Sequence, residues 1–268
     1  MVKFIKVTRP EFSLVRIPVS VCAVVFSLAG CGQDYSLNPP ADSEKITVTV
    51  KLPKELKTEA MWVMYRSAKC KRVSRGASGQ RTERDGHHSI YQEFERQGQS
   101  NLYKIELAKD GGGDCKWHLA NVTFGVKYDN PKIFGEKTLS GGGGGVVVIF
   151  DRNNSPRGGA NIKVDGDLVI KKDYYPWLSE VFLGGYRKHI SLVGDGGIYL
   201  KYQALEARQV YFEPVLHGGF SIRSIQPKEK RQGNYTSYIY PDGTIAADGK
   251  RHPDFQRLQS IRLAAENK

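Results

Sequence analysis

Runs of alternating apolar and polar residues begin at residue 45 and recur along the chain. The first run, 45–52, alternates isoleucine, valine and leucine with threonine and lysine, which is typical of a strand with one buried face. The same period returns in 102–107 and 122–126, and glycine-rich turns separate many of the runs. The pattern predicts a mainly β fold, an antiparallel β-sandwich-like arrangement of short strands.

The pattern continues in the second part of the chain. We expect a hairpin over 162–170 and a closing hairpin in which the Pro-Asp-Gly of 241–243 turns the strand at 235–240. Apolar residues at helical spacing predict one short C-terminal helix over 254–266. Further strands are expected at 189–193, 198–202, 210–212 and 220–225.

A polar stretch, 151–160, divides this pattern into two halves, 45–151 and 160–268. The turn spacing fits one shared core and fits equally two β-rich halves with separate cores. Within the second half, 173–186 is rich in tyrosine, tryptophan and phenylalanine and allows a short helix after Pro176. Its aromatic side chains form either core or a platform that binds a partner or a sugar.

The chain starts with a basic segment and an apolar run, 17–30. This run is too short, and contains a proline, to span a bilayer whose apolar core is about 30 Å thick. We therefore expect 1–30 to be a signal peptide. It ends in Leu-Ala-Gly before Cys31, which resembles the lipobox at which bacterial lipoproteins are acylated and cleaved. Ordinary cleavage beside an incidental cysteine is the alternative.

The lipobox implies a location. Gly32 follows the cysteine in place of the aspartate that usually retains enterobacterial lipoproteins in the inner membrane. The resemblance therefore implies anchoring to the inner leaflet of the outer membrane, facing the periplasm, with the N-terminal lipid as the only membrane contact. Residues 31–44 are polar and contain two consecutive prolines, and we expect them to form a flexible tether.

Basic residues outnumber acidic ones, 40 against 28, for a formal net charge of +12. Removal of 1–30 would take away four basic residues and one acidic residue, which leaves 36 against 27 and a net charge of +9. This balance favours an acidic partner or an anionic surface. A periplasmic location argues against nucleic acid as that partner.

Two cysteines remain once Cys22 leaves with the signal peptide and Cys31 takes the lipid. Because the periplasm is oxidising, Cys70 and Cys115 are expected to form a disulfide. A zinc site that uses both thiolates together with His118 is the alternative, although a tetrahedral site needs a fourth ligand. We expect no metal and no cofactor.

Basic residues gather in two stretches. The first, 69–88, has almost no apolar residue and forms either a solvated hairpin tip or a partner-binding segment. The second is 226–234. As candidate contacts to an acidic face of the partner we name Arg72, Arg75, Arg81, Arg84, Lys228, Lys230 and Arg231.

Common catalytic motifs are missing from the sequence. The chain contains neither the Gly-x-Ser-x-Gly of a nucleophile elbow nor the His-Glu-x-x-His of zinc proteases. The glycine run 141–145 leads into a strand-like stretch without the Lys-Ser/Thr of a phosphate-binding loop, so we interpret it as a flexible turn before a buried strand. We therefore interpret the protein as a binding protein and not an enzyme.

Two segments of the chain resemble a known class of binding proteins. The string QGQSNLYKIELAKDGGGDCKWHLANVTFGVK at 97–127 and GGGGGVVVIFD at 141–151, together with the lipobox, resemble lipoproteins known as type VI secretion immunity proteins of enterobacteria. The resemblance covers about the middle third of the chain. It implies a periplasmic protein that binds and neutralises a cognate secreted antibacterial effector, in several systems a phospholipase, by occluding its active site.

Two other hypotheses remain open. The protein could be an envelope binding module, anchored to the outer membrane, that recognises a glycan or an anionic lipid through the aromatic residues of 174–186. An unrecognised hydrolase is the third, because catalytic residues can assemble from distant positions.

Overall fold

The computed structural model of the chain describes residues 33–152, 162–195 and 199–267. The chain divides into two compact units, Met1–Asp34 and Tyr35–Lys268, and the fold described here is that of the second. The predicted signal peptide 1–30 and the predicted lipidation site Cys31 lie outside the described residues. Within the described ranges, no helix is long and apolar enough to cross a membrane.

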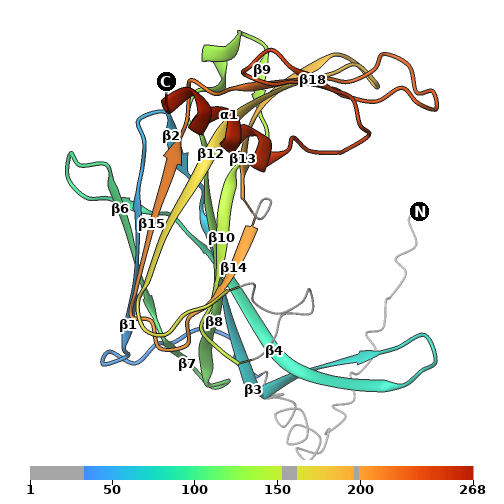
Figure 1. The fold of residues 1–268 in the computed structure, drawn as a ribbon. Helices are drawn as coiled ribbons and strands as arrows, with labels where there is room; N and C mark the ends of the chain where they lie inside the picture. The colour runs from blue at the N-terminus through green and yellow to red at the C-terminus, as the bar shows by residue number, and fades with distance from the viewer. Residues whose placement is uncertain (1–32, 153–161, 196–198, 268) are drawn as a thin grey trace, which may run out of the picture. The chain divides into compact units, whose positions relative to one another are not determined.

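Two mixed β-sheets form the body (Figure 1). The strands of the first sheet are β1 (Lys45–Lys51), β5 (Glu95–Arg96), β6 (Leu102–Ala108), β9 (Thr138–Ser140), β12 (Leu168–Val181), β13 (Arg187–Gly194), β15 (Gln209–Leu216), β16 (Ile222–Ile225), β17 (Ser237–Ile239) and β18 (Ile245–Ala246). Their order is β18-β17-β16-β12-β15-β1-β6-β5, and β13 pairs with both β12 and β9.

The second sheet has the order β11-β14-β10-β8-β3-β4, and both β2 and β7 pair with β8. Its strands are β2 (Leu56–Thr58), β3 (Met61–Arg75), β4 (Arg81–Gln92), β7 (Asp110–Gly112), β8 (Trp117–Tyr128), β10 (Gly144–Ile149), β11 (Ile162–Lys163) and β14 (Tyr199–Gln203). A 3-10 helix, η2 (Pro131–Phe134), and the C-terminal helix α1 (Phe255–Glu266) complete the described elements.

The predicted fold class is confirmed: the protein is mainly β, sandwich-like, with one short C-terminal helix. The sheets are mixed, however, and not antiparallel throughout. The parallel pairs β1–β15, β10–β14 and β9–β13 all join a strand of the first predicted half to a strand of the second. Alternation of side chains marks the buried face of a strand but carries no information about the direction of its neighbour.

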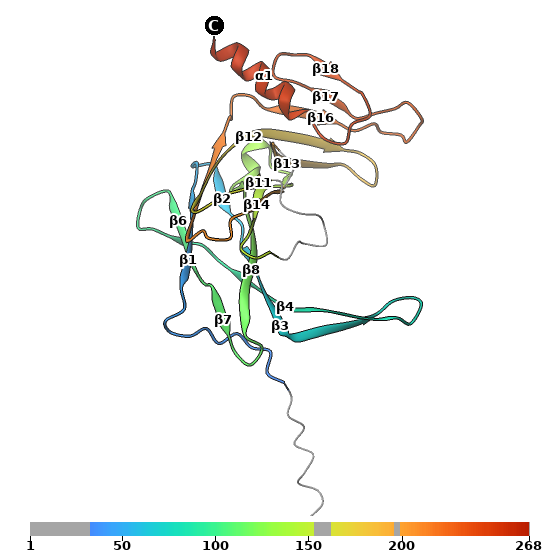
Figure 2. The same ribbon diagram turned by 60° about the horizontal axis from the view of Figure 1, so that its bottom comes forward.

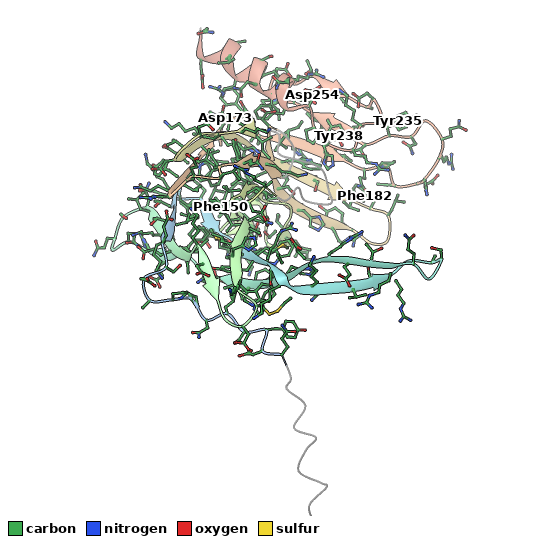
Figure 3. The ribbon with its side chains drawn as sticks, turned by 90° about the horizontal axis from the view of Figure 1, so that it is seen from below. Phe150, Asp173, Phe182, Tyr235, Tyr238 and Asp254 are labelled. Carbon is green, nitrogen blue, oxygen red and sulfur yellow. A yellow bond between two sulfur atoms is a disulfide. The ribbon has the colours of Figure 1, made fainter. Side chains whose placement is uncertain are left out.

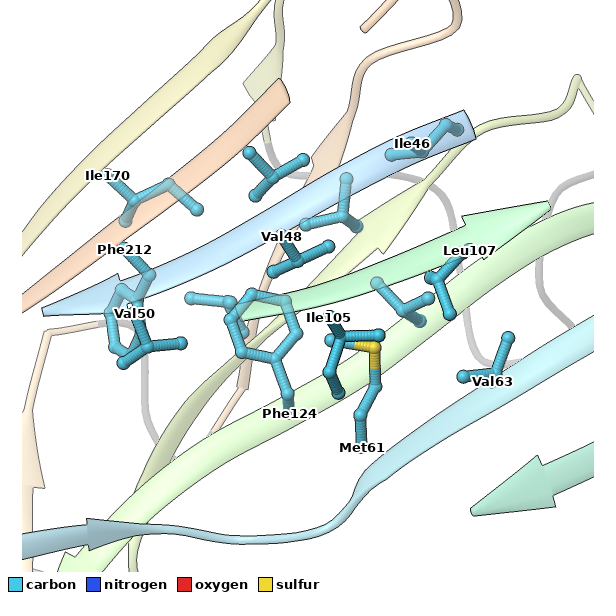
Figure 4. Close-up of a cluster of buried hydrophobic side chains, with 14 of the residues drawn as sticks. Ile46, Val48, Val50, Met61, Val63, Ile105, Leu107, Phe124, Ile170 and Phe212 are labelled. Atoms are coloured by element: carbon cyan, nitrogen blue, oxygen red, sulfur yellow. The ribbon is translucent and has the colours of Figure 1, made fainter. Parts of the chain in front are cut away.

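The two predicted halves share one core. On β1, Ile46, Val48 and Val50 are fully buried and alternate with partly exposed threonines, as the pattern predicts. They pack with side chains of β3, β6 and β8 from the first half, and with Ile170 and Phe212 from the second (Figure 4). The main cluster of buried side chains therefore draws on strands from both sides of 151–160, a stretch that itself lies mostly outside the described residues.

A second, smaller cluster lies under α1. Leu258 of the helix is fully buried and packs with Tyr175, Ile222 and Tyr238 of the first sheet. Asp254 caps the helix, because its side chain accepts a hydrogen bond from the backbone N–H of Arg257. The predicted C-terminal helix and the predicted closing hairpin, β17–β18, are both confirmed.

Two predictions in the second half are wrong. No helix follows Pro176, because β12 continues as a strand to Val181. Pro176 falls between the last residue paired with β15, Tyr174, and the first paired with β16, Trp177, where a missing N–H costs little. The hairpin predicted over 162–170 is also absent, since β11 pairs with β14 and β12 pairs with β13, β15 and β16.

Part of the predicted tether lies on the body. The backbone N–H of Asn38 donates to the carbonyl of Gly111 at 3.0 Å, and the hydroxyl of Ser43 donates to the carbonyl of Asp110 at 3.2 Å. Gly112 permits this approach, because a Cβ there would lie 2.0 Å from the carbonyl oxygen of Asn38. Residues 35–44 therefore belong to the compact unit, which shortens the predicted tether.

Candidate partner-binding site

The β3–β4 hairpin has two parts. Near its base, β3 also pairs with β8 and belongs to the sheet. Beyond a register shift between Ser67 and Arg72, the hairpin pairs only with itself, and every residue of 71–84 is exposed. Figure 1 shows this part extending away from the body. We call 71–84 the basic arm, because it contains five basic residues and one acidic residue.

Like charges face each other across the basic arm. In the register of the two strands, Arg72 lies directly opposite Arg84, and Arg75 lies directly opposite Arg81. Like charges in this position destabilise a strand pair. The acidic residue, Glu83, forms an ion pair with Arg81 at 3.2 Å, and both side chains are more than half exposed. The arm therefore keeps a surplus of positive charge that its own residues do not neutralise.

The base of the arm is held firmly. The predicted disulfide is confirmed: Cys70 at the base is bonded to Cys115, which lies in the turn that leads into β8. The hydroxyl of Ser67 donates to the Cys115 carbonyl and accepts from the backbone N–H of Cys70 at 2.9 Å. Gly86 lies so close that an added Cβ would be 1.9 Å from the Cys70 carbonyl oxygen. These contacts fix the direction in which the arm leaves the sheet.

The alternative zinc site is excluded by this geometry. Cys70 and Cys115 are bonded to each other, so neither offers a thiolate to a metal. In the described ranges, no group of three or more His, Cys, Asp and Glu side chains is placed to hold a metal ion. His118 lies on an exposed position of β8, where its register partners are Arg66 and Asp110.

A recess of about 320 Å³ lies beside the base of the arm. Burial, followed by the charges of Arg72 and Arg66, lowers the pKa of His87 in this recess. The neighbouring His88 ring packs against Trp117, with the ring centroids 5.6 Å apart. The recess is lined by Tyr35, Cys70, Lys71, Arg72, Gly86, His87, His88 and Trp117. Its two cations make it a suitable site for an acidic side chain.

The second predicted basic stretch, 226–234, follows β16. Its candidate contacts Lys228, Lys230 and Arg231 are all exposed. The amine of Lys228 lies over the ring of Phe182, 5.7 Å from its centroid, at the tip of the β12–β13 hairpin. Arg231 is paired with Glu229 at 2.6 Å. We call 226–234 the basic loop.

The arm and the basic loop extend to the same side of the body. Figures 1 and 2 show the β3–β4 hairpin and the connection from β16 to β17 projecting in the same direction. Figure 3 places Phe182 and Tyr235 toward that side as well. The predicted contact residues therefore form two separate basic groups that face one side, and not one continuous patch.

The aromatic residues of 173–186 are divided between core and surface. Tyr174 and Tyr175 are fully buried, which removes them from any surface platform. Phe182 and Tyr186 meet at the tip of the β12–β13 hairpin with ring centroids 5.4 Å apart, and Tyr186 is 54% exposed. Trp177 lines a pocket near α1 that the sequence analysis missed.

Comparison with models of protein families, with curated proteins and with solved structures found no match to the chain. The resemblance of 97–127 and 141–151 to type VI immunity lipoproteins therefore stays a prediction from the sequence.

Proposed function

We propose that the protein is a periplasmic lipoprotein that binds a secreted antibacterial effector and neutralises it by occluding its active site. The observation that carries the proposal is the basic arm, in which Arg72 faces Arg84 and Arg75 faces Arg81, while the arm's single acidic residue, Glu83, pairs with Arg81 alone. The confirmed disulfide supports it, because such bonds persist in oxidising compartments. The resemblance to immunity lipoproteins indicates the class of partner, a secreted antibacterial effector. Within that class we propose a phospholipase as the specific effector.

The mechanism follows from the arm's construction. The base of the arm is fixed by the disulfide and by Ser67, whereas the side chains of the arm are exposed. The arm can therefore enter the active-site cleft of a partner while the other strands stay folded. Carboxylates of the partner would bind the arginines in bidentate pairs and relieve the repulsion between them. Charge complementarity of this kind accelerates association and excludes partners of the wrong charge.

Co-expression tests the proposal. We expect a neighbouring gene to encode the effector, and the chain, directed to the periplasm, should rescue cells from that effector when the effector is also directed there. The reason is that occlusion needs only the two folded proteins in one compartment. Growth of the co-expressing cells is the measurement. Rescue by an empty vector, or continued killing despite normal amounts of the folded chain, would contradict the proposal.

Charge reversal tests the role of the arm. Replacement of Arg72 and Arg75 by glutamate should weaken binding to that effector by about tenfold or more, because two desolvated charge pairs are lost. Binding should also become less sensitive to salt. The matched control replaces Lys54 and Lys132, which are exposed and lie away from the arm, by glutamate and changes the net charge equally. Equal affinities for the two variants would remove the arm from the site.

A further inference from the structure

A pocket of about 470 Å³ lies where the end of β13, the glycine run and the turn before α1 meet. Its walls include Trp177, Leu192, Val193, His252, Pro253 and Phe255. The volume falls in the range of about 300–1,000 Å³ that is typical of small-molecule sites. The pocket lies on the first sheet and includes no residue of the basic arm, so it is separate from the proposed partner-binding site.

The glycine run shapes one wall of this pocket. β9 belongs to the first sheet and β10 to the second, so the run carries the chain from one sheet to the other. An added Cβ would lie 2.1 Å from the Ser191 hydroxyl at Gly141, 2.4 Å from the Val126 carbonyl at Gly143, and 2.0 Å from the Tyr174 ring at Gly144. Close packing therefore demands glycine at these three positions.

Gly142 differs from its neighbours in the run. A Cβ added there would meet nothing within 4 Å, and the residue lines the pocket. Its N–H donates to the Ser191 hydroxyl at 3.0 Å and its carbonyl accepts from Leu192 at 2.9 Å. Any residue except proline could make these backbone contacts. Packing does not require a glycine at 142, and its lack of a side chain leaves that wall of the pocket open.

Two polar side chains of the pocket wall already have hydrogen-bond partners. The indole N–H of Trp177 donates to the hydroxyl of Ser224 at 2.8 Å, and the hydroxyl of Ser191 accepts from Gly142. No lining residue carries a carboxylate, an ammonium or a guanidinium group. The His252 imidazole and the Ser191 hydroxyl proton are the side-chain groups that could still bond a polar ligand, so a charged ligand would lose its hydration for few contacts, whereas an apolar ligand has no such cost.

The two aromatic walls favour a flexible ligand over a flat one. The Trp177 and His252 rings lie 5.8 Å apart at an interplanar angle of 79°, so they form a corner. A planar molecule can stack on one of these rings only. A hydrocarbon chain can bend and contact both. We propose that this pocket binds the hydrocarbon chain of a lipid and leaves the head group in solvent.

The test uses three lipids with one chain length and different head groups: laurate, dodecanol and lauroyl lysophosphatidylcholine, each below its micellar concentration. Binding is followed by calorimetry and by the change in tryptophan fluorescence; of the three tryptophans, Trp62, Trp117 and Trp177, only Trp177 lines this pocket. We expect saturable binding of one lipid per chain, with dissociation constants that agree within about threefold because the head group stays in water. Absence of binding, or selection of one head group by more than about tenfold, would overturn the proposal.

Two variants locate the site. Gly142→Leu should fill the pocket and weaken laurate binding by about tenfold or more, because the added side chain occupies the ligand's volume. Gly218→Leu is the matched control, since a Cβ there also meets nothing within 4 Å and the residue does not line the pocket. His252→Glu, at an exposed position of the wall, should also weaken binding by placing a charge beside the chain.

The melting temperatures of these variants show whether each one folds. Laurate binding that is unchanged in both folded Gly142→Leu and folded His252→Glu would place the lipid elsewhere and overturn the assignment. Loss of binding in Gly218→Leu to the same extent as in Gly142→Leu would do the same.

Discussion

Lys172 lies on β12 with 5% of its surface exposed, and its amine has no hydrogen-bond partner among the described residues. The amine lies 5.5 Å from the centroid of the Tyr174 ring. Burial lowers the pKa of Lys172 from 10.5 to about 8, and the nearby charge of Asp195 opposes this shift only in part. At neutral pH the folded protein therefore holds an ammonium group that has lost most of its hydration.

Replacement of this lysine should stabilise the protein in a pH-dependent way. Between pH 8 and pH 10.5 the unfolded chain keeps the Lys172 proton that the folded chain has lost, so the stability of the parent rises with pH across this window. Lys172→Met should raise the free energy of unfolding by about 1 kcal/mol or more at pH 7, because it removes a buried charge. The gain should shrink toward pH 10.5. Urea unfolding at several pH values measures it.

The neighbouring lysine supplies the control. The Lys171 side chain is 68% exposed and pairs with Glu213 at 3.6 Å. Lys171→Met should therefore change stability by less than about 1 kcal/mol, with no gain that fades between pH 8 and pH 10.5. A Lys172→Met variant that behaves like this control would show that the buried amine finds a partner in solution.

The position of Lys172 could have been predicted from the sequence. Leu168, Ile170 and Tyr174 are buried and separated by even numbers of residues on β12, so Lys172, two residues after Ile170 and two before Tyr174, belongs to the same face. The polar triplet Lys-Lys-Asp at 171–173 interrupts the apolar alternation, so the buried face is not evident there from hydrophobicity alone. The Cys70–Cys115 disulfide was predictable for a different reason, since only two cysteines remain once the other two are assigned to the N-terminal segment.

At the scale of single strands, the sequence predicts well which face of a strand is buried, and it predicts poorly which other strands that strand pairs with. The alternation on β1 and β8 identifies the residues that enter the core. That β1 pairs with β15 depends on contacts more than a hundred residues away, and no local pattern records them. The glycine run shows the same limit. The buried strand after it was predicted, but Gly144 and Gly145 belong to that strand and not to a flexible turn, and the passage of the run between two sheets follows only from the tertiary fold.

The basic arm should gain stability from a substitution that weakens its function. Arg84 lies directly opposite Arg72. The substitution Arg84→Glu therefore places a carboxylate opposite the Arg72 guanidinium. We expect the strands of the arm to pair more tightly by about 0.5–1 kcal/mol, because an opposed like-charge pair becomes an opposite-charge pair. Hydrogen exchange of the arm's backbone amides should slow by about two- to fivefold, while binding to an acidic partner weakens.

Lys71→Glu is the matched control for this prediction. It makes the same change of charge in the arm, but Lys71 has no register partner on β4. Exchange in the arm should then change little. Equal protection in the two variants would show that the opposed arginines do not repel each other measurably, so that a partner would have no repulsion to relieve.

At the scale of the whole compact unit, one core supports both basic segments. The arm leaves the second sheet and the basic loop leaves the first, yet both extend to the same side (Figures 1 and 2). Each sheet is anchored in the main cluster of buried side chains, which contains residues of both predicted halves. A partner that bridges the two segments would therefore meet charges from both sheets, held on one rigid framework.

We expect both basic segments to contact the same partner molecule. Reversal of Lys230 and Arg231 to glutamate should weaken binding to the proposed effector, and the effect should add to that of Arg72→Glu with Arg75→Glu, because the two segments share no side-chain partners. Each pair of reversals should reduce the slope of log Kd against log salt concentration, whereas Lys54→Glu with Lys132→Glu should not.

Calorimetry gives the affinity and confirms that one partner binds per chain. Reversal of the basic loop without any loss of affinity would limit the interface to the arm, and a non-additive combination would show that the two segments compete for one acidic surface instead of holding it together.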